Sequence, residues 1–136
     1  MLDIPLARTG AYVSFATSND ENHPASNVLD GNSSTFWVTT GLLPQSIIIS
    51  FPNVVNLKKI KITIFKVQNL IIEKSMKPRA KDFDIVTEKS FKNDNHYVQE
   101  SEIEFGHNFQ ARHLKFTISE AYDSFVGIQH ILAVFG

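Results

Sequence analysis

Residues 27–36 of the chain, NVLDGNSSTF, gather side-chain oxygens at a spacing that can hold a cation. Calcium binds six to eight oxygen atoms at about 2.3–2.6 Å, drawn from carboxylates, amide and backbone carbonyls, hydroxyls and water. Asp30 supplies the one carboxylate of this stretch, and Asn27, Asn32 and Thr35 supply carbonyl or hydroxyl oxygens. A cation held here needs further oxygens from the backbone and from a distant strand.

The spacing excludes an EF-hand, because the sixth position counted from Asp30 is Thr35 rather than Gly, and the twelfth is Gly41 rather than Glu. An ordinary turn is the alternative, in which Asp30 and Asn32 hydrogen-bond to their own backbone. Trp37, the only tryptophan, follows this loop directly. We expect its ring either to pack in the core beneath the loop or to form an exposed ligand platform.

Strands are the elements that must position this loop, because the dominant hydrophobic period of the chain is two. The segments KKIKITIF (residues 58–65) and RHLKFTIS (residues 112–119) show it most clearly. The side chains expected to face a core are Ile60, Ile62, Ile64, Leu114, Phe116 and Ile118. Those expected to face water are Lys59, Lys61, Thr63, His113, Lys115 and Thr117.

Other segments rich in β-branched and aromatic residues predict further strands at AYVSFA, QSIIISF, NLIIEK, FDIVTE, HYVQESEIEF and VGIQHILAVF. Turn residues separate them at SNDENHP, LDGNSS, FPN, MKPRAKD and KNDN. No segment keeps a helical period, so any helix is a short turn near residues 24–29. The pattern predicts an all-β sandwich of jelly-roll type, with a strand order that the sequence does not specify.

Composition narrows the functional classes. The 136 residues suit one domain spanning 1–136, and 43% of them are hydrophobic. A net charge of −1 gives no positive electrostatic field that could attract nucleic acid or an acidic membrane. With no cysteine, the chain has no thiol nucleophile, thiolate metal site or disulfide. No signal peptide or membrane-spanning window is visible, so we expect a soluble intracellular protein without membrane insertion.

The stretch NVLDGNSSTFWVT resembles the signature of the galactose-binding-like (discoidin, or coagulation-factor type C) sandwich, in which Asn/Ala-x-x-Asp-Gly-Asn-x-x-Thr-x-Trp closes a metal loop. A longer set covers nearly the whole chain in order: ATSNDENHPASNVLDGNSSTFWVTTGLLPQ, VQNLIIEKS and HLKFTISEAYDSF. This set resembles the intraflagellar transport protein 25 family, also described as small heat-shock-protein-beta-like. The resemblance implies a jelly-roll sandwich rather than an α-crystallin fold.

The resemblance also implies a structural calcium ion, carried over to Asn27, Asp30 and Thr35 with a carbonyl from Asn32. In the wider superfamily a Glu on the final strand completes the cage, but here Gln129-His130 occupies that place. With one carboxylate against a dication, we expect weak affinity, on the order of 10⁻⁴–10⁻³ M. The ion would then act as a loop staple and not as a signalling switch.

The same family resemblance implies a partner and a location. Its members form a heterodimer, rather than a homo-oligomer, with a Rab-like small GTPase, intraflagellar transport protein 27. The pair belongs to complex B, which moves ciliary cargo and helps signalling components leave the cilium. We therefore expect a non-catalytic adaptor of the cilium or flagellum and the cytoplasm. The alternative is an intracellular discoidin-like module that binds a carbohydrate or a lipid headgroup.

Enzymatic and zinc-binding functions find little support. The chain lacks Gly-x-Ser-x-Gly, a glycine-rich phosphate loop and His-Glu-x-x-His. Its histidines have no tetrahedral-site spacing: His23, His96, His107, His113 and His130. Two apolar groups can be either core or a partner-binding patch. These groups are Leu42 with Leu43, and Phe65 with Val67 and Leu70.

Overall fold

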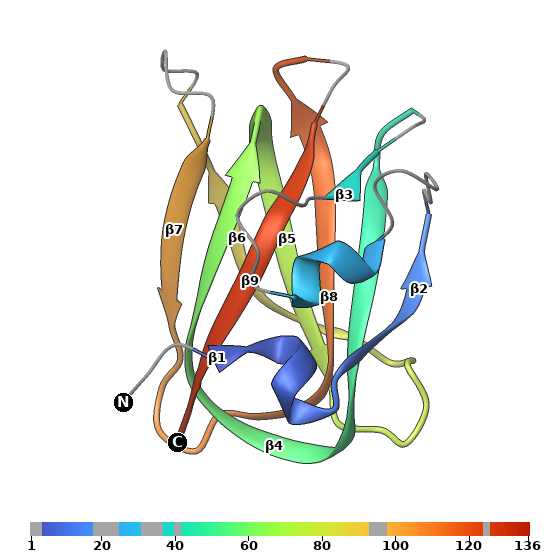
Figure 1. The fold of residues 1–136 in the computed structure, drawn as a ribbon, viewed down its shortest axis with the longest axis vertical. Helices are drawn as coiled ribbons and strands as arrows, with labels where there is room; N and C mark the ends of the chain where they lie inside the picture. Colours follow the sequence, from blue (N-terminus) through green and yellow to red (C-terminus); the bar gives the residue numbers. More distant parts are fainter. Residues whose placement is uncertain (1–3, 18–24, 31–36, 40–41, 93–97, 124–125) are drawn as a thin grey trace.

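The computed structural model describes residues 4–17, 25–30, 37–39, 42–92, 98–123 and 126–136. These residues form β-strands and two short 3₁₀-helices, η1 and η2 (Figure 1). In chain order the elements are β1 (Ile4–Pro5), η1 (Leu6–Thr9), β2 (Tyr12–Ala16), η2 (Ala25–Leu29), β3 (Trp37–Val38), β4 (Gln45–Phe65), β5 (Val67–Ser75), β6 (Asp84–Ser90), β7 (Gln99–Glu104), β8 (Gln110–Ala121) and β9 (Gly127–Phe135). The short helical turn expected near residues 24–29 is confirmed as η2.

The strands form two antiparallel sheets packed face to face, which confirms the predicted all-β jelly-roll sandwich. Sheet A contains β7, β4 and β9 in that order, with β1 and β3 both paired to β9. Sheet B has the order β2, β4, β8, β5, β6. Among the strands that the structure describes, β4 alone belongs to both sheets. Figure 1 shows it bending beneath the sandwich to join them.

The turn predicted at FPN is wrong, because β4 runs through these residues without a break. Its residues up to Ser50, and again Val55 and Asn56, pair with β8 in sheet B, and from Leu57 onward β4 pairs with β9 in sheet A. The register with β8 shifts between Ser50 and Val55, so the bend lies there. Pro52 cannot donate a backbone hydrogen bond, which suits its position in the interruption of the pairing between Ser50 and Val55.

The core lies between the sheets and follows the predicted alternation. All six side chains expected to face inward are fully buried: Ile60, Ile62, Ile64, Leu114, Phe116 and Ile118. Two side chains expected to face water are buried instead, since Thr63 is 2% exposed and His113 is 3% exposed. Both lie on the outer side of their sheet. They are buried because His130 hydrogen-bonds over Thr63, and the chain at Lys77 crosses over His113.

Candidate functional site

Helix η2 holds Asn27, and Asp30 follows its last residue, so two of the predicted cation ligands lie three residues apart around this turn. A 3₁₀-helix has three residues per turn, so side chains at positions i and i+3 lie above one another. Asn27 and Asp30 have this spacing, and the Asp30 amide donates to the Asn27 carbonyl at 3.4 Å. Between them, Val28 and Leu29 are buried in the core. The apolar pair therefore fixes the turn, while Asn27 is half-buried and Asp30 is exposed.

The other two predicted ligands, Asn32 and Thr35, lie outside the described residues. Asn27 and Asp30 offer an amide and a carboxylate, which are hard oxygen donors of the kind that calcium prefers. Within the described part of the chain, no group of three or more His, Asp or Glu side chains could hold a metal ion. A cation at this loop therefore depends on hydroxyl, amide and backbone oxygens besides Asp30.

Trp37 anchors the chain behind the loop. Its side chain is fully buried, so the core-ring interpretation is confirmed and the exposed platform is wrong. Strand β3 pairs with β9 through Trp37 opposite Ile128 and Val38 opposite Gly127. The contact at Gly127 is very close, because a Cβ there would lie 1.9 Å from the Trp37 carbonyl oxygen. Only glycine lets the two backbones approach in this way.

His130 lies on β9, in the Gln129-His130 pair at which the family resemblance implies a carboxylate. Its Nε2 lies 3.2 Å from the Thr63 hydroxyl, and its Nδ1 is buried with no hydrogen-bond partner. Burial lowers the pKa of His130 below 6.5, against the opposing charges of Glu100 and Asp30. Asp30 is thus near enough to act on this ring electrostatically. The lowered pKa keeps this imidazole largely uncharged at neutral pH.

A serine and a histidine that the sequence did not connect meet on the outer side of sheet B. The Ser50 hydroxyl lies 2.6 Å from His113 Nδ1 and 2.7 Å from the Ser14 hydroxyl. His113 Nε2 must donate to the Lys77 carbonyl, 2.9 Å away, because a carbonyl only accepts. In the neutral ring, Nδ1 is then an acceptor that faces the Ser50 hydroxyl. Since Ser50 is fully buried, these bonds tie β2, β4, β8 and the chain after β5 together.

Exposed apolar side chains follow strand β2 at the edge of sheet B. Tyr12 and Phe15 are 52% and 51% exposed, and Leu42 is 92% exposed. A bulge between Val13 and Phe15 allows both rings onto the outer side of the sheet. The Leu42 carbonyl accepts from the side chain of Gln45, whose Oε1 accepts from Thr17 just beyond β2. We call Tyr12, Phe15 and Leu42 the β2 apolar strip.

The second apolar group considered as an interface is core. Phe65, Val67 and Leu70 are at most 2% exposed. The alternation breaks between them because Lys66 has a positive φ of 57° and turns the chain from β4 into β5. Of the two candidate groups, Leu42 alone remains strongly exposed, while Leu43 is partly buried against the core.

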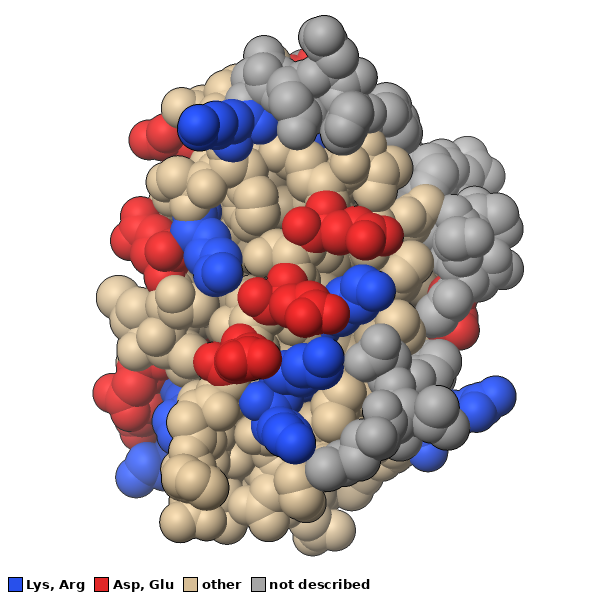
Figure 2. All heavy atoms as spheres, turned by 90° about the vertical axis from the view of Figure 1, so that its left-hand side faces the viewer, with Lys and Arg blue, Asp and Glu red and all other residues tan. Residues whose placement is uncertain are grey.

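The outer side of sheet A carries facing columns of opposite charge. Strand β7 exposes Glu100, Glu102 and Glu104, and the register sets Lys59 opposite Glu104 and Lys61 opposite Glu102. Figure 2 shows basic and acidic groups interspersed over the side of the sandwich where β7 lies. Mixed signs of this kind produce no extended field for a polyanion.

The F5/8 type C domain model matches residues 14–131, most of the chain. The protein is therefore a β-sandwich of the F5/8 type C, or discoidin-like, class. One relative is the human intraflagellar transport protein 25 homolog, which is 39% identical over 97% of this chain and 91% of its own length. Another is Chlamydomonas reinhardtii intraflagellar transport protein 25, which is 29% identical over 100% of this chain and 71% of its own length. The chain belongs to the intraflagellar transport protein 25 family.

Solved structures share the fold at low identity. The family 32 carbohydrate-binding module of Clostridium perfringens NanJ, in complex with galactose, superposes with a TM-score of 0.79 at 23% identity and covers 96% of each chain. A second Clostridium perfringens family 32 module, in complex with GalNAc-β-1,3-galactose, gives 0.80 at 17% identity and covers 99% of this chain and 100% of its own. These likenesses establish the galactose-binding-like jelly roll, and carbohydrate binding by this chain stays a prediction. No helix in the described ranges is long and apolar enough to cross a bilayer.

Proposed function

We propose that the chain is a non-catalytic subunit of intraflagellar transport complex B that forms a heterodimer with a Rab-like small GTPase. In this role it supports ciliary cargo transport and the export of signalling components, within the cilium or flagellum and the cytoplasm. The observation that carries the proposal is the 39% identity to the human intraflagellar transport protein 25 homolog, which extends over 97% of this chain. Similarity along nearly the full length suits a role in which the whole domain is the working unit.

The β2 apolar strip supports a role in binding another protein. Soluble chains rarely keep large apolar side chains exposed along one edge unless a partner covers them. Leu42 is almost fully exposed, and about half of the Tyr12 and Phe15 side chains is exposed. Aromatic side chains are also enriched among the residues that dominate binding energy at protein interfaces. The strip is therefore a reasonable place for the GTPase to contact this chain.

Coexpression with the Rab-like GTPase, followed by size-exclusion chromatography, tests the proposed pairing. We expect the two chains to elute together, and we expect Tyr12→Ser combined with Leu42→Ser to weaken the complex. Ile85→Ser is the matched control, because Ile85 is 68% exposed at the opposite edge of sheet B. Failure of the unaltered chain to elute with the GTPase would contradict the heterodimer. An intact complex with the double variant would contradict only the location of the contact.

We also propose that Asn27, Asp30 and Thr35 hold a structural calcium ion, with a dissociation constant on the order of 10⁻⁴–10⁻³ M. The ion would supply a positive charge that joins the oxygens of the loop. Calorimetric titration of the chain with calcium tests this, with thermal stability as a second readout. Asp30→Ala should abolish both the heat of binding and the stabilisation. Submicromolar affinity would contradict the role of a weak loop staple.

A further inference from the structure

Strand β7 forms an edge of sheet A that is regular enough to take another strand. It pairs with β4 on one side, and no other described strand pairs with its second side, which we call the free side of β7. The register with β4 runs from Gln99 opposite Ile64 to Glu104 opposite Lys59 without a shift. Figure 1 shows β7 outermost at the left of the sandwich, so the free side faces away from the fold.

The other edge strands are less suited to pairing. Strands β1 and β3 are two residues long each. Strands β2 and β6 each carry an extra residue against their neighbour, Ser14 in β2 and Val86 in β6. Short strands and bulges are common means by which proteins prevent pairing at an edge. Among the edges that the structure describes, β7 has neither of these features, and it is six residues long.

The glutamates of β7 direct their backbone groups toward the free side. In an antiparallel pair, residues that bond to the neighbouring strand alternate with residues whose N–H and C=O groups point away from it. The Phe105 amide donates to the Lys58 carbonyl at 2.9 Å, so Phe105 bonds to β4. By alternation, the residues two and four positions earlier also bond to β4. Glu100, Glu102 and Glu104 therefore offer their N–H and C=O groups to the free side.

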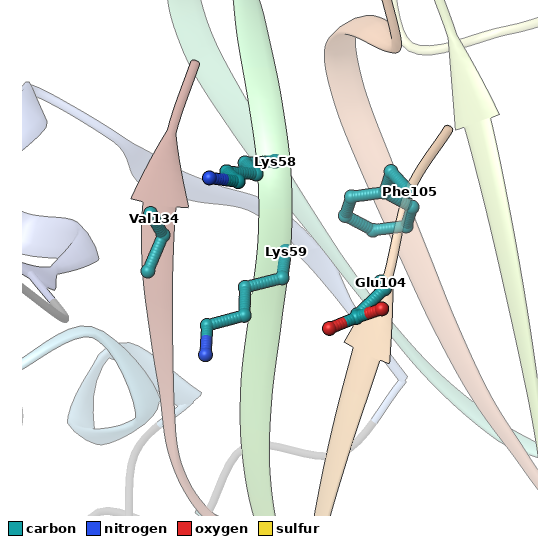
Figure 3. Close-up of a pocket in the computed structure, with 5 residues that line it drawn as sticks. All are labelled: Lys58, Lys59, Glu104, Phe105 and Val134. Atoms are coloured by element: carbon teal, nitrogen blue, oxygen red, sulfur yellow. The ribbon is translucent and has the colours of Figure 1, made fainter. Parts of the chain in front are cut away.

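The same glutamates expose their side chains on the outer side of sheet A. Glu102 has an ion pair with Lys59 at 3.7 Å. Glu100 lies opposite Thr63, which is uncharged. Glu104 lies opposite Lys59, but Figure 3 shows the Lys59 side chain extending toward β9, away from Glu104. Within the described residues, Glu100 and Glu104 therefore have no ion pair.

These charges select the kind of strand that fits. If a second copy of this chain paired antiparallel along the same edge, its glutamates would lie directly opposite those of β7, and like charges in that position are destabilising. A strand with Lys or Arg at alternate positions instead sets a cation opposite each glutamate. Strand β4 already has this pattern, because Lys59 and Lys61 lie opposite Glu104 and Glu102.

We propose that the free side of β7 binds an extended segment of a partner protein with Lys or Arg at alternate positions, which joins sheet A as an antiparallel strand. Backbone hydrogen bonds along the edge give affinity, and the alternating basic side chains give specificity. The residues between them lie beside Ser101 and Ile103, and Ile103 is buried, so β-branched apolar side chains suit these places. The β2 apolar strip lies at the other side of the sandwich (Figure 1), so this site does not depend on the GTPase partnership.

NMR titration of the full chain, labelled with ¹⁵N, tests this strand addition. The probe is the peptide Thr-Lys-Val-Lys-Val-Lys-Thr, and its control has the same composition in the order Lys-Lys-Val-Thr-Thr-Val-Lys. We expect saturable shifts of the backbone amide signals of Glu100, Glu102 and Glu104. The affinity should fall as salt is raised, because exposed charges are screened. The control peptide has lost the alternation and should bind more weakly.

Methylation of single peptide amides separates strand addition from simple charge attraction. In the proposed pairing the amide of the central Lys points at β7. Its methylation should raise the dissociation constant at least about tenfold, because it removes a hydrogen bond and blocks close approach. The amide of each Val points away from β7, so its methylation should change the affinity little. Equal binding of the two methylated peptides would overturn the proposal, as would a loss confined to the Val-methylated one.

Substitutions in β7 test the same contact from the protein. Glu102→Pro removes the amide hydrogen on the free side and leaves the bonds to β4, a place where an edge strand tolerates proline. Glu102→Gln removes the same charge but keeps the N–H group, so it should bind the peptide more tightly than Glu102→Pro. Glu100→Gln combined with Glu104→Gln should raise the dissociation constant about fivefold, the effect of two exposed ion pairs. Asp84→Asn combined with Glu120→Gln, two exposed carboxylates of sheet B, is the matched control and should leave it unchanged.

Circular dichroism checks that each variant is folded. Absence of saturable binding up to about 1 mM would overturn the proposal. Equal binding of the ordered and scrambled peptides would do the same, as would shifts confined to another edge such as β6. Shifts of the β7 amides that grow with protein concentration, without any peptide, would mean that a second copy occupies the edge instead.

Discussion

Replacing Gly127 by alanine tests whether close backbone packing between β3 and β9 holds Trp37 in place. A Cβ at residue 127 would lie 1.9 Å from the Trp37 carbonyl oxygen and 3.0 Å from its carbonyl carbon. It would also lie 3.0 Å from Cζ of Phe65. The nearest contact is with backbone, so no side-chain rotation relieves it. Strand β3 must move away from β9, and Trp37 must move with it.

The cost follows from what that movement breaks. Forcing extra atoms into a packed core costs about 1–3 kcal/mol when neighbours can shift slightly. Removing a buried Trp side chain from its contacts costs about 3–5 kcal/mol. Because the Trp37 ring is fully buried, displacement of β3 also removes some of its core contacts and so adds part of that stability cost. We therefore expect Gly127→Ala to lower the free energy of unfolding by about 3 kcal/mol, and the Tm by roughly 10 °C.

Urea denaturation followed by tryptophan fluorescence measures this effect, since Trp37 is the only tryptophan. Gly106→Ala is the matched control, because a Cβ there would meet no atom within 4 Å. Both substitutions restrict the unfolded chain similarly, so their difference isolates the native-state clash. A difference below about 1 kcal/mol would refute the reasoning. In that case Trp37 is not held by the approach of β3 to β9.

Three further outcomes are expected. Ser50→Ala removes the partner of the buried His113 Nδ1 and should cost about 1–3 kcal/mol in urea denaturation; a neutral result would mean that the network adds no stability. Burial lowers the pKa of His130, so the unfolded chain binds its proton more tightly and stability should fall as pH drops below 6.5. His130→Gln should flatten that slope, and an unchanged profile would assign it to another group. Gly10→Ala forces a φ of +82° on an L-residue and should lower the free energy of unfolding, measured by thermal denaturation, by about 1–2 kcal/mol. An unchanged free energy of unfolding would mean that the turn relaxes freely.

Much of the sandwich could be predicted from hydrophobic alternation. Burial of one strand face imposes a period of two, and the Ile60, Ile62, Ile64 series shows it without interruption. The path of β4 could not be predicted in this way. Phe-Pro-Asn has the composition of a turn, and its behaviour depends on which strands pair with the residues on either side. Those pairings involve β8 and β9, which lie far away along the chain.

Burial of polar side chains escaped prediction for the same reason. Alternation says which side of a sheet His113 occupies, and it does so correctly. Whether that side is exposed to water depends on which segments cover it, and here the segment at Lys77 covers His113. Thr63 is similar, because the ring covering it belongs to His130 on another strand. A strand pattern therefore predicts orientation but leaves accessibility to long-range contacts.

The candidate cation loop shows how far spacing alone can go. Asn-x-x-Asp suits an ordinary turn and a metal ligand pair equally, because a 3₁₀ turn aligns positions i and i+3 in both cases. Burial of Val28 and Leu29 and the hydrogen bond from the Asp30 amide to the Asn27 carbonyl fix this turn without any ion. If calcium binds as proposed, the turn exists beforehand and binding need not organise it. Calcium should then stabilise the chain by simple mass action, with a shift in Tm that grows with concentration above its dissociation constant.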